Sequence, residues 1–521
     1  MSDTGEAEHQ YGKGGKGALG WLALSVALVA GLAFFLQKKT DEPGAKSLTV
    51  YCAAGIQLPV EEAARQFEKE LGVKVHLEYA SSGVLANKLK LDQEANRPRA
   101  DVYIPADFTF TERARADGLT AETLKVASWK IVLAVKPGAG IDVKNIDELL
   151  EQKISFVICE PLAGAGKKTK KVLQAAGKWE AVDAAKTASF PTVPEAALAV
   201  KETGTQAAFL WNSTAAQHGL KVIELPELEK SRAEITVAVT ATTDRSALAL
   251  QFARFLAAPE MGGKVFTRHK YEPIAGDRWA KKPVLRVDCG GVNREAVEKT
   301  IREFMEREGC EVRTVYDGCG TLVSKMQTSD IGLPDVFLTC DASYLDKAQD
   351  AMGSPFGPDL KVSSTRIVML VAKGNPKGLK DLAGLARAGL RIGTTDPKVS
   401  TLGALSHDLF RETGHLDAIK TNITKDGVMT DTAHTLIQTM EAGGKLDVAL
   451  VYEANIQHLK DKFDFVPLAP PRSLAVQNIA ANKSAAYPQL AQRLMQHIIS
   501  DTSKRRFEQL GFQWVAGAPK P

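Results

Sequence analysis

Cysteine is scarce in this chain of 521 residues, and the spacings that would turn it into a zinc site are missing. Only 6 cysteines occur, and no two of them form a Cys-x-x-Cys or zinc-knuckle pair. The 9 histidines are scattered without ligand spacing, which is typical of surface histidines. These absences leave no signature of a zinc site, and we expect no cofactor.

A strong excess of charge of one sign is also missing. The chain has 66 Lys and Arg residues against 62 Asp and Glu residues, which gives a net charge of +4 at pH 7. So small an excess gives no support for a nucleic-acid partner. Apolar residues make up 44% and charged residues 25% of the chain, values that are ordinary for soluble globular domains.

One long apolar run departs from this soluble pattern. Residues 17–36 carry no charge and are about 20 in number, enough to cross a bilayer as a helix. A secretory signal has a shorter apolar run and a small-residue cleavage site, and no lipid-accepting cysteine follows this run. The sequence predicts a transmembrane anchor at 17–36, with a removed signal as the alternative. A disordered N-terminus (1–16) precedes it and a linker (37–46) follows.

Most of the remaining sequence occurs twice. VYCAAG at 50–55 returns as VDCGGV at 287–292, and ADVYIPAD at 100–107 returns as PDVFLTCD at 334–341. KIVLAV at 130–135 likewise matches RIVMLV at 366–371. Repeats of this length fit whole domains rather than solenoid units. The sequence therefore predicts two tandem modules, 47–280 and 281–521.

Within each module, short apolar runs alternate with helical patterns. Residues 48–52 form a predicted strand, and apolar residues then recur at helical spacing from Pro59 until Gly72. The alternation predicts α/β modules whose lobes are doubly wound sheets covered by helices. In such sheets ligands bind beyond the carboxyl ends of the strands. The small residues that follow these strands allow close approach to helix N-termini, which favour an anion.

At these residues the chain resembles the extracytoplasmic molybdate-binding proteins of ABC importers, a branch of the type II periplasmic binding fold. The resemblance rests on CAAG at 52–55, ASSG at 80–83 and ADVYIPAD at 100–107. It implies two hinged lobes per module. The first module divides into 47–128 with 240–280 and 129–238, and the second into 284–364 with 474–519 and 365–472.

The resemblance also implies an oxyanion pocket built from backbone N–H groups and hydroxyls. Carried over motif by motif, it falls in the first module on Ala54, Gly55, Ser82, Gly83, Ala165, Gly166, Val193 and Trp211. In the second module it falls on Gly291, Val292, Cys319, Gly320, Leu402, Gly403, Thr432 and Tyr452. One family hydroxyl is absent from both modules, and the other is kept only in the first. Each lost contact to a charged oxyanion costs about 1–3 kcal/mol.

Other features have competing interpretations. Cys289, Cys319 and Cys340 follow three adjacent strands, and they fit core packing, a disulfide or a soft-metal site. The lysine-rich run KKTKK at 167–171 fits either a solvated helix face or the steering of anions. Asp107 and Asp341, which end the third strand of each module, fit helix capping as well as ligand contact.

These observations favour a membrane-tethered solute-binding protein that captures a molybdate-like or tungstate-like oxyanion for an ABC transporter permease. It would be anchored in the cytoplasmic membrane, with both modules facing the periplasm or cell exterior. Degenerate modules that act as a sensor or scaffold are one alternative. Soft-metal or iron binding by the second module is another, although the chain lacks the adjacent tyrosines of the iron-binding branch. We expect no enzyme activity, because no partner that would activate Cys319 as a nucleophile can be named.

Overall fold

The computed structural model describes residues 47–328 and 332–516. The predicted transmembrane anchor at 17–36 and its flanking segments, 1–16 and 37–46, lie outside the described residues. Among the helices that are described, none combines the length and the apolar composition needed to span a bilayer.

The first module contains two lobes, each built on its own sheet. The sheet of the first lobe has the order β11-β4-β10-β3-β1-β2, in which β1, β2 and β3 are parallel and β10 is antiparallel to β3. Its strands are β1 (Ser47–Ala53), β2 (Lys74–Ala80), β3 (Val102–Ile104), β4 (Thr120–Trp129), β10 (Ala233–Thr240) and β11 (Glu272–Pro273). Its helices are η1 (Ala54–Ile56), α2 (Gln57–Leu71), α3 (Ser82–Glu94), α4 (Phe108–Ala116), α10 (Ser246–Ala257), η3 (Pro259–Gly263) and α11 (Lys264–Arg268).

The second lobe of this module has the strand order β7-β6-β8-β5-β9. Its strands are β5 (Ile131–Val135), β6 (Phe156–Cys159), β7 (Ala188–Phe190), β8 (Ala207–Trp211) and β9 (Lys221–Ile223). Its helices are α5 (Ile146–Glu151), α6 (Gly164–Ala175), α7 (Trp179–Ala185), α8 (Val193–Glu202), α9 (Asn212–Gln217) and η2 (Pro226–Ser231). The chain crosses between the lobes after β4 and again before β10, which gives the two crossing segments that the resemblance implies.

The second module repeats this plan with one difference at the crossing. Its strand β15 (Leu360–Ala372) continues through both lobes, pairing with β20 in the first and with β18 and β19 in the second. The first lobe contains β12 (Val284–Gly290), β13 (Glu311–Asp317), β14 (Val336–Leu338), β20 (Leu474–Ala481), β21 (Gln513–Trp514), η4 (Gly291–Asn293), α12 (Arg294–Glu308), α13 (Cys319–Thr328), α14 (Ala342–Met352), α18 (Pro488–Ile498) and α19 (Asp501–Gln509). The second lobe contains β16 (Ile392–Thr395), β17 (Val428–Thr430), β18 (Val448–Tyr452), β19 (Phe463–Pro467), η5 (Ala383–Ala386), α15 (Thr401–Glu412), α16 (Leu416–Lys425), α17 (Ala433–Glu441), η6 (Glu453–Asn455) and η7 (Gln457–Leu459).

The first long helix of each module forms for the same local reasons. In α2, Val60, Ala63 and Phe67 recur at helical spacing and are buried. Phe67 packs edge-on against Phe252 of α10, with ring centroids 5.0 Å apart. Gly72 ends α2 with a φ of 66°, a left-handed conformation that costs glycine no steric strain. The equivalent helix α12 ends in the same way, at Gly309. The sequence pattern from Pro59 to Gly72 thus predicted α2 correctly.

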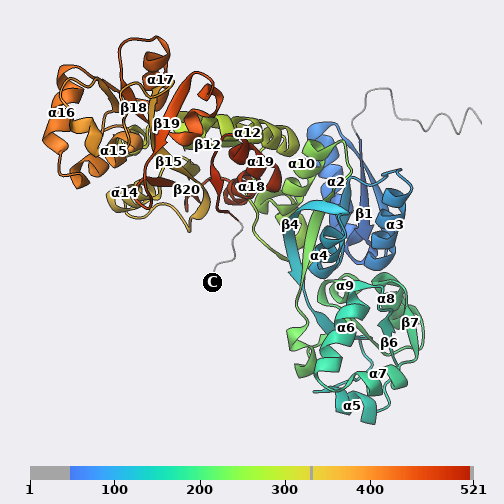
Figure 1. Cartoon of the computed structure of the whole chain (residues 1–521). Coiled ribbons are helices and arrows are strands. Elements are labelled where there is room, and N and C mark those ends of the chain that lie inside the picture. Colours follow the sequence, from blue (N-terminus) through green and yellow to red (C-terminus); the bar gives the residue numbers. More distant parts are fainter. Residues whose placement is uncertain (1–46, 329–331, 517–521) are drawn as a thin grey trace, which may run out of the picture.

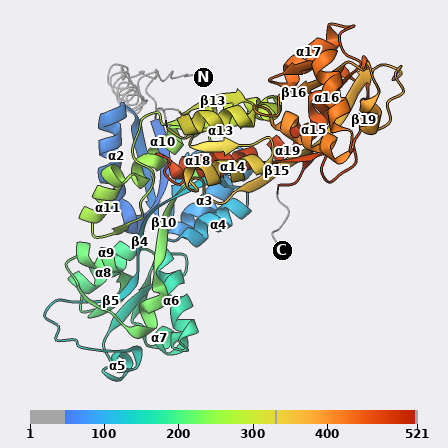
Figure 2. The same cartoon turned by 90° about the vertical axis from the view of Figure 1, so that its left-hand side faces the viewer.

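The two first lobes lie together at the centre of the molecule, and the second lobes lie at its outer ends (Figures 1 and 2). At the junction, α10 of the first module packs against α12 of the second. The helices approach closely because Gly309 has no side chain, and a Cβ there would lie 3.1 Å from the Cβ of Ala247. The modules are therefore joined by a packed interface as well as by the chain itself.

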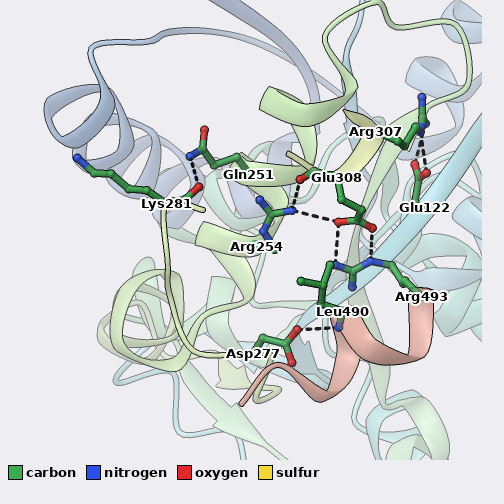
Figure 3. Close-up of polar contacts among 9 residues, drawn as sticks. All are labelled: Glu122, Gln251, Arg254, Asp277, Lys281, Arg307, Glu308, Leu490 and Arg493. Carbon is green, nitrogen blue, oxygen red and sulfur yellow. Dashed lines mark hydrogen bonds and ion pairs between the residues drawn. The ribbon is translucent and has the colours of Figure 1, made fainter. Parts of the chain in front are cut away.

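A buried group of charges forms the centre of this interface (Figure 3). The carboxylate of Glu308 accepts hydrogen bonds from Arg254 of the first module at 3.1 Å and from Arg493 of the second at 2.6 Å. The side chains of Arg254 and Glu308 are only 6% and 2% exposed. Beside them, Asp277 of the connecting segment accepts hydrogen bonds from the N–H groups of Gln489 and Leu490 at the start of α18. Such a buried group fixes geometry, because removing one member leaves a charge without a partner in a dry environment.

Candidate functional site

The cleft between the lobes of the second module contains a pocket of about 520 Å³. This volume lies within the range of small-molecule sites. The pocket lies where α15 and α17 begin, beside η4 and the loop before α13. It is lined by Gly291, Val292, Arg294, Glu295, Glu298, Tyr316, Asp317, Gly318, Cys340, Ser400, Thr401, Leu402, Asp431, Thr432, Ala433, His434, Tyr452 and Asn455. Helix N-termini present unpaired N–H groups and a positive dipole end, so this cleft suits an electron-rich group.

Two hydrogen-bonding atoms in the lining of this pocket are buried and have no protein partner, the hydroxyl of Tyr452 and the side-chain oxygen of Asn455. The hydroxyl of Thr401 lies beside the thiols of Cys319 and Cys340. Burial raises the pKa of Tyr452 well above its ordinary value, and the nearby Cys340 and Asp341 raise it further. Tyr452 therefore remains a neutral hydroxyl that can donate. A buried polar atom without a partner costs free energy, and a polar solute in the pocket would remove that cost.

Charged side chains of mostly negative sign also line the pocket. Glu295, Glu298, Asp317 and Asp431 contribute carboxylates. The guanidinium of Arg294 lies over the ring of Tyr316, 5.2 Å from its centroid, and Lys325 pairs with Asp317 at 2.8 Å. The pocket thus combines neutral donors with carboxylates, a combination that the motif comparison did not predict.

The predicted site residues of the second module divide into those that line the pocket and those that do not. The pocket is lined by five of them, Gly291, Val292, Leu402, Thr432 and Tyr452.

The other three predicted residues lie behind this lining. Cys319 is fully buried at the start of α13. Gly320 and Gly403 lie so close to neighbouring backbone that a side chain would not fit. An added Cβ on Gly320 would lie 2.8 Å from the Lys398 oxygen, and one on Gly403 would lie 2.3 Å from the Thr395 oxygen. Thr401 and Asn455 were missing from the predicted set. The signal for Thr401 was its place beside Ser400 at the start of a helix, and nothing in the sequence pointed to Asn455.

In the first module, aromatic side chains fill the equivalent space. The rings of Trp129 and Trp211 stack in parallel with centroids 4.3 Å apart, and Tyr271 lies 5.2 Å from Trp129. Both tryptophans are buried. Gly55 faces this cluster, since a Cβ on it would meet Trp129 at 3.4 Å and Val193 at 3.7 Å. Trp211 and Val193 are thus together, as the pocket prediction requires, but Trp129 and Tyr271 lie among them.

The other predicted residues of the first module are held by contacts with protein atoms, and one of these contacts, from Gly83 to Leu162, crosses the cleft. Ser82 Oγ accepts a hydrogen bond from the Ala106 N–H at 3.0 Å, and the Gly83 N–H donates to the Leu162 oxygen at 3.0 Å. Ala54 begins η1. Ala165 and Gly166 are buried in the first turn of α6, where a Cβ on Gly166 would lie 2.1 Å from the Glu160 oxygen.

One of the lysines at 167–171 also joins the lobes of the first module. Lys168 of α6 pairs with Asp107 at 2.9 Å, and the two side chains are 11% and 2% exposed. Neighbouring Lys167 donates to the Thr109 hydroxyl, and burial lowers its pKa. Asp107 also caps α4 by accepting from the Thr109 N–H at 2.9 Å, and Asp341 caps α14 in the same way. The capping interpretation of both aspartates is confirmed.

All six cysteines are free thiols in buried positions. Cys319 and Cys340 lie in contact, with their sulfurs 3.0 Å apart, whereas Cys289 bonds to the oxygen of Gly290. In the part of the chain that the structure describes, no three His, Cys, Asp or Glu side chains are grouped as metal ligands.

Comparison with known proteins finds a family whose model matches both modules. The model of the bacterial extracellular solute-binding protein family matches residues 48–271 and, a second time, residues 285–513. The molybdate-binding protein ModA of Escherichia coli is 29% identical over 261 residues, which are 48% of this chain and 97% of that protein. ModA of Mycobacterium tuberculosis is 26% identical over 208 residues, 39% of this chain and 74% of that protein. Among solved structures, the periplasmic molybdate-binding protein of Azotobacter vinelandii is similar, with 21% identity and a TM-score of 0.37. The match covers 43% of this chain and 98% of that one.

Proposed function

The chain belongs to the bacterial extracellular solute-binding proteins, with two copies of the family's fold in tandem, and we propose that its second module captures the solute. The observation that carries this proposal is the contrast between the clefts. The second contains an open pocket in which the hydroxyl of Tyr452 and the side-chain oxygen of Asn455 have no partner, whereas Trp129 and Trp211 fill the first. The first module then serves as a structural partner.

The proposed solute is a small oxyanion of the molybdate or tungstate class. Three features support it: the N-termini of α15 and α17, the neutral hydroxyls of Thr401 and Tyr452, and the names of the two curated relatives. Neutral donors in a cleft that excludes water can hold a dianion without a cationic side chain, because hydrogen bonds to an ionised acceptor are stronger than neutral ones.

Capture proceeds by hinged closure. The donors at the start of α15 and the hydroxyl of Tyr452 belong to the second lobe, whereas η4 and the loop before α13 belong to the first. A solute that contacts both lobes stabilises the closed arrangement over the open one by the difference in its contacts. Release follows when a partner favours the open arrangement.

The partner that this proposal implies is an ABC-type permease. Capture would take place in the periplasm or at the cell exterior, and the segment 17–36 would hold the protein at the membrane. The support is the family itself and the apolar composition of that segment. The mechanism is binding, and no chemical step is needed.

A second candidate follows from the carboxylates of the pocket. Glu295, Glu298 and Asp431 would repel a free dianion, but they would attract an ammonium group. A zwitterionic solute would place its anionic group at the helix N-termini and its cationic group beside these side chains. The pocket volume of about 520 Å³ also accommodates a solute larger than a tetrahedral oxyanion.

Calorimetric titration of the full-length chain separates the two candidates. Molybdate, tungstate, sulfate and phosphate form one set of ligands, and free amino acids form the other. The oxyanion proposal expects saturable heat with one site per chain for at least one member of the first set. Heat only from the amino acids would replace it with the second candidate. No heat from either set at micromolar protein would contradict both.

A further inference from the structure

The bottom of the second module's cleft contains two thiols that contact one another. The thiol of Cys319 donates to the sulfur of Cys340 at 3.0 Å, and the N–H of Cys340 donates back to the sulfur of Cys319 at 3.0 Å. Both side chains are buried, and they belong to different elements, the start of α13 and the end of the loop after β14. The protein therefore holds the two sulfurs together through tertiary structure.

Three positions differ from the first module in a way that makes space for these sulfurs. Cys319 and Cys340 replace Ser82 and Ala106, and Gly290 replaces Ala53. A Cβ on Gly290 would lie 2.3 Å from the sulfur of Cys340 and 2.9 Å from that of Cys319. A Cβ does not come this close to an atom to which it is not bonded, so the pair of sulfurs requires glycine at 290.

The backbone contact of the pair is the same in both modules. The Ala106 N–H donates to the Ser82 hydroxyl at 3.0 Å, as the Cys340 N–H donates to the Cys319 sulfur. Cys319 thus keeps the position of a hydroxyl while it gains a sulfur neighbour. Serine in the first module shows that the packing of this turn does not itself need sulfur.

We propose that Cys319 and Cys340 form a reversible disulfide site, oxidised by exchange with a small disulfide that enters through the pocket. Cys340 lines the pocket, whereas Cys319 lies behind it and is fully buried. The hydrogen bond from Cys319 lowers the pKa of Cys340, and burial raises the pKa of Cys319. The thiol that lines the pocket is therefore the one more readily ionised, as exchange requires.

The exchange balances in two steps. The Cys340 thiolate attacks one sulfur of the small disulfide, whose S–S bond breaks and releases one thiolate, and a mixed disulfide forms on Cys340. The Cys319 thiol passes its proton to the released thiolate and then attacks the sulfur of Cys340. The mixed S–S bond breaks, and the second half of the oxidant leaves as a thiolate, which takes up from solvent the proton that Cys340 released on ionising. The protein has lost two hydrogens, and the small disulfide has become two thiols.

The test uses the reduced full-length chain and oxidised glutathione as the small disulfide. Intact mass should fall by two hydrogens, alkylation of the unfolded product should find two fewer free thiols, and a peptide map should join Cys319 to Cys340. A reducing thiol should restore the starting mass. This readout does not depend on the identity of the solute, so failure of the proposed function leaves it intact.

Variants make the assignment specific. Cys319→Ser and Cys340→Ser should each abolish the intramolecular product. The matched control Cys289→Ser, which changes a buried cysteine on the neighbouring strand end, should still be oxidised. Circular dichroism checks that each variant is folded. If a variant does not fold, the peptide map of the oxidised wild-type chain still tests whether Cys319 and Cys340 are joined. A folded wild-type chain that keeps all six thiols, retains only a mixed disulfide or joins another cysteine pair would overturn the proposal.

Discussion

Trp129 and Trp211 stack face to face between the lobes of the first module, with ring planes within 6° of parallel. The repeat places Thr365 and Tyr452 at the same positions in the second module. Thr365 uses its hydroxyl to accept a hydrogen bond from the Ala454 N–H, and Tyr452 faces the pocket. The cleft is filled in the first module, which has Trp129, and open in the second module, which has the smaller Thr365 at the same position.

Replacing Trp129 tests whether this stack stabilises the first module. Trp129→Thr should lower the free energy of unfolding by about 3–5 kcal/mol, because it removes a large buried side chain and leaves a cavity between the lobes. Denaturant unfolding measures the loss. Tyr271→Phe is the milder comparison, since it removes a hydroxyl, with its hydrogen bond to the Gly55 oxygen, and keeps the ring. Equal stability of Trp129→Thr and wild type would show that the stack is dispensable.

Removing the Tyr452 hydroxyl tests the pocket. Tyr452→Phe should weaken solute binding by about 1–3 kcal/mol, a loss typical of a hydrogen bond to a charged group, while making the free protein no less stable. The second effect follows because the hydroxyl has no protein partner. Calorimetry with the best ligand measures the first effect and thermal unfolding the second. Tyr271→Phe in the first module should keep wild-type affinity, and equal weakening by both variants would argue against a site in the second module.

The buried charges between the modules give a third prediction. Glu308→Ala should destabilise the chain by about 3–5 kcal/mol, because Arg254 and Arg493 would remain buried without their shared carboxylate. Arg307→Ala breaks the nearby pair with Glu122, whose side chains are 27% and 21% exposed, and should cost less, about 1 kcal/mol. Denaturant unfolding compares the two. A larger loss for Arg307→Ala would mean that burial does not control the energetics of this interface.

Asp288 makes stability depend on pH. Burial raises its pKa from 3.8 to about 6, and Arg286 and Lys325 offset part of that rise. Between these pH values the folded state binds more protons than the unfolded state, so stability falls as pH rises from 3.8 to about 6 and is level above. Asp288→Asn should therefore be more stable than wild type at pH 7, with the difference shrinking towards pH 4. A difference that is constant with pH would contradict this assignment.

Glycine 290 provides a test of the space around the two sulfurs. Gly290→Ala should destabilise the chain by about 1–3 kcal/mol through overpacking, and Cys340→Ala in the same chain should restore part of the loss. The restoration is partial because the Cys340 nitrogen would still lie 2.8 Å from the new Cβ. Gly291→Ala is the matched control, since its nearest neighbour, the Asp317 oxygen, is 3.7 Å away. Equal effects at both glycines would refute the crowding argument.

Local signals in the sequence were sufficient to predict most of the fold. The helix that starts near Pro59 and ends at Gly72 depends on spacing and capping within one element, and the structure confirms it. The duplication likewise needed only two matching series of motifs. Small residues after the strands correctly indicated where helix N-termini meet, because the carboxyl ends of parallel strands share one edge.

The contents of the clefts were less predictable, since side-chain packing between distant segments decides them. Trp129 gives no sign in the sequence that it will stack on a residue of the other lobe. Lys168 lies in a lysine-rich run that is typical of a solvated face, yet its pairing with Asp107 buries it. Arg254 and Glu308 are 54 positions apart and look like ordinary surface charges until the modules are packed together.

Because the contacts of Glu308 fasten the two inner lobes to one another, the protein has one central block and two separate arms. The hinge motion proposed for the second module would then move one arm relative to this central block and leave the other arm in place. A pair of spectroscopic labels, one on each arm, would report solute uptake as a change in one distance. The arm of the first module would thus serve as a fixed reference for measuring how far the cleft of the second module closes.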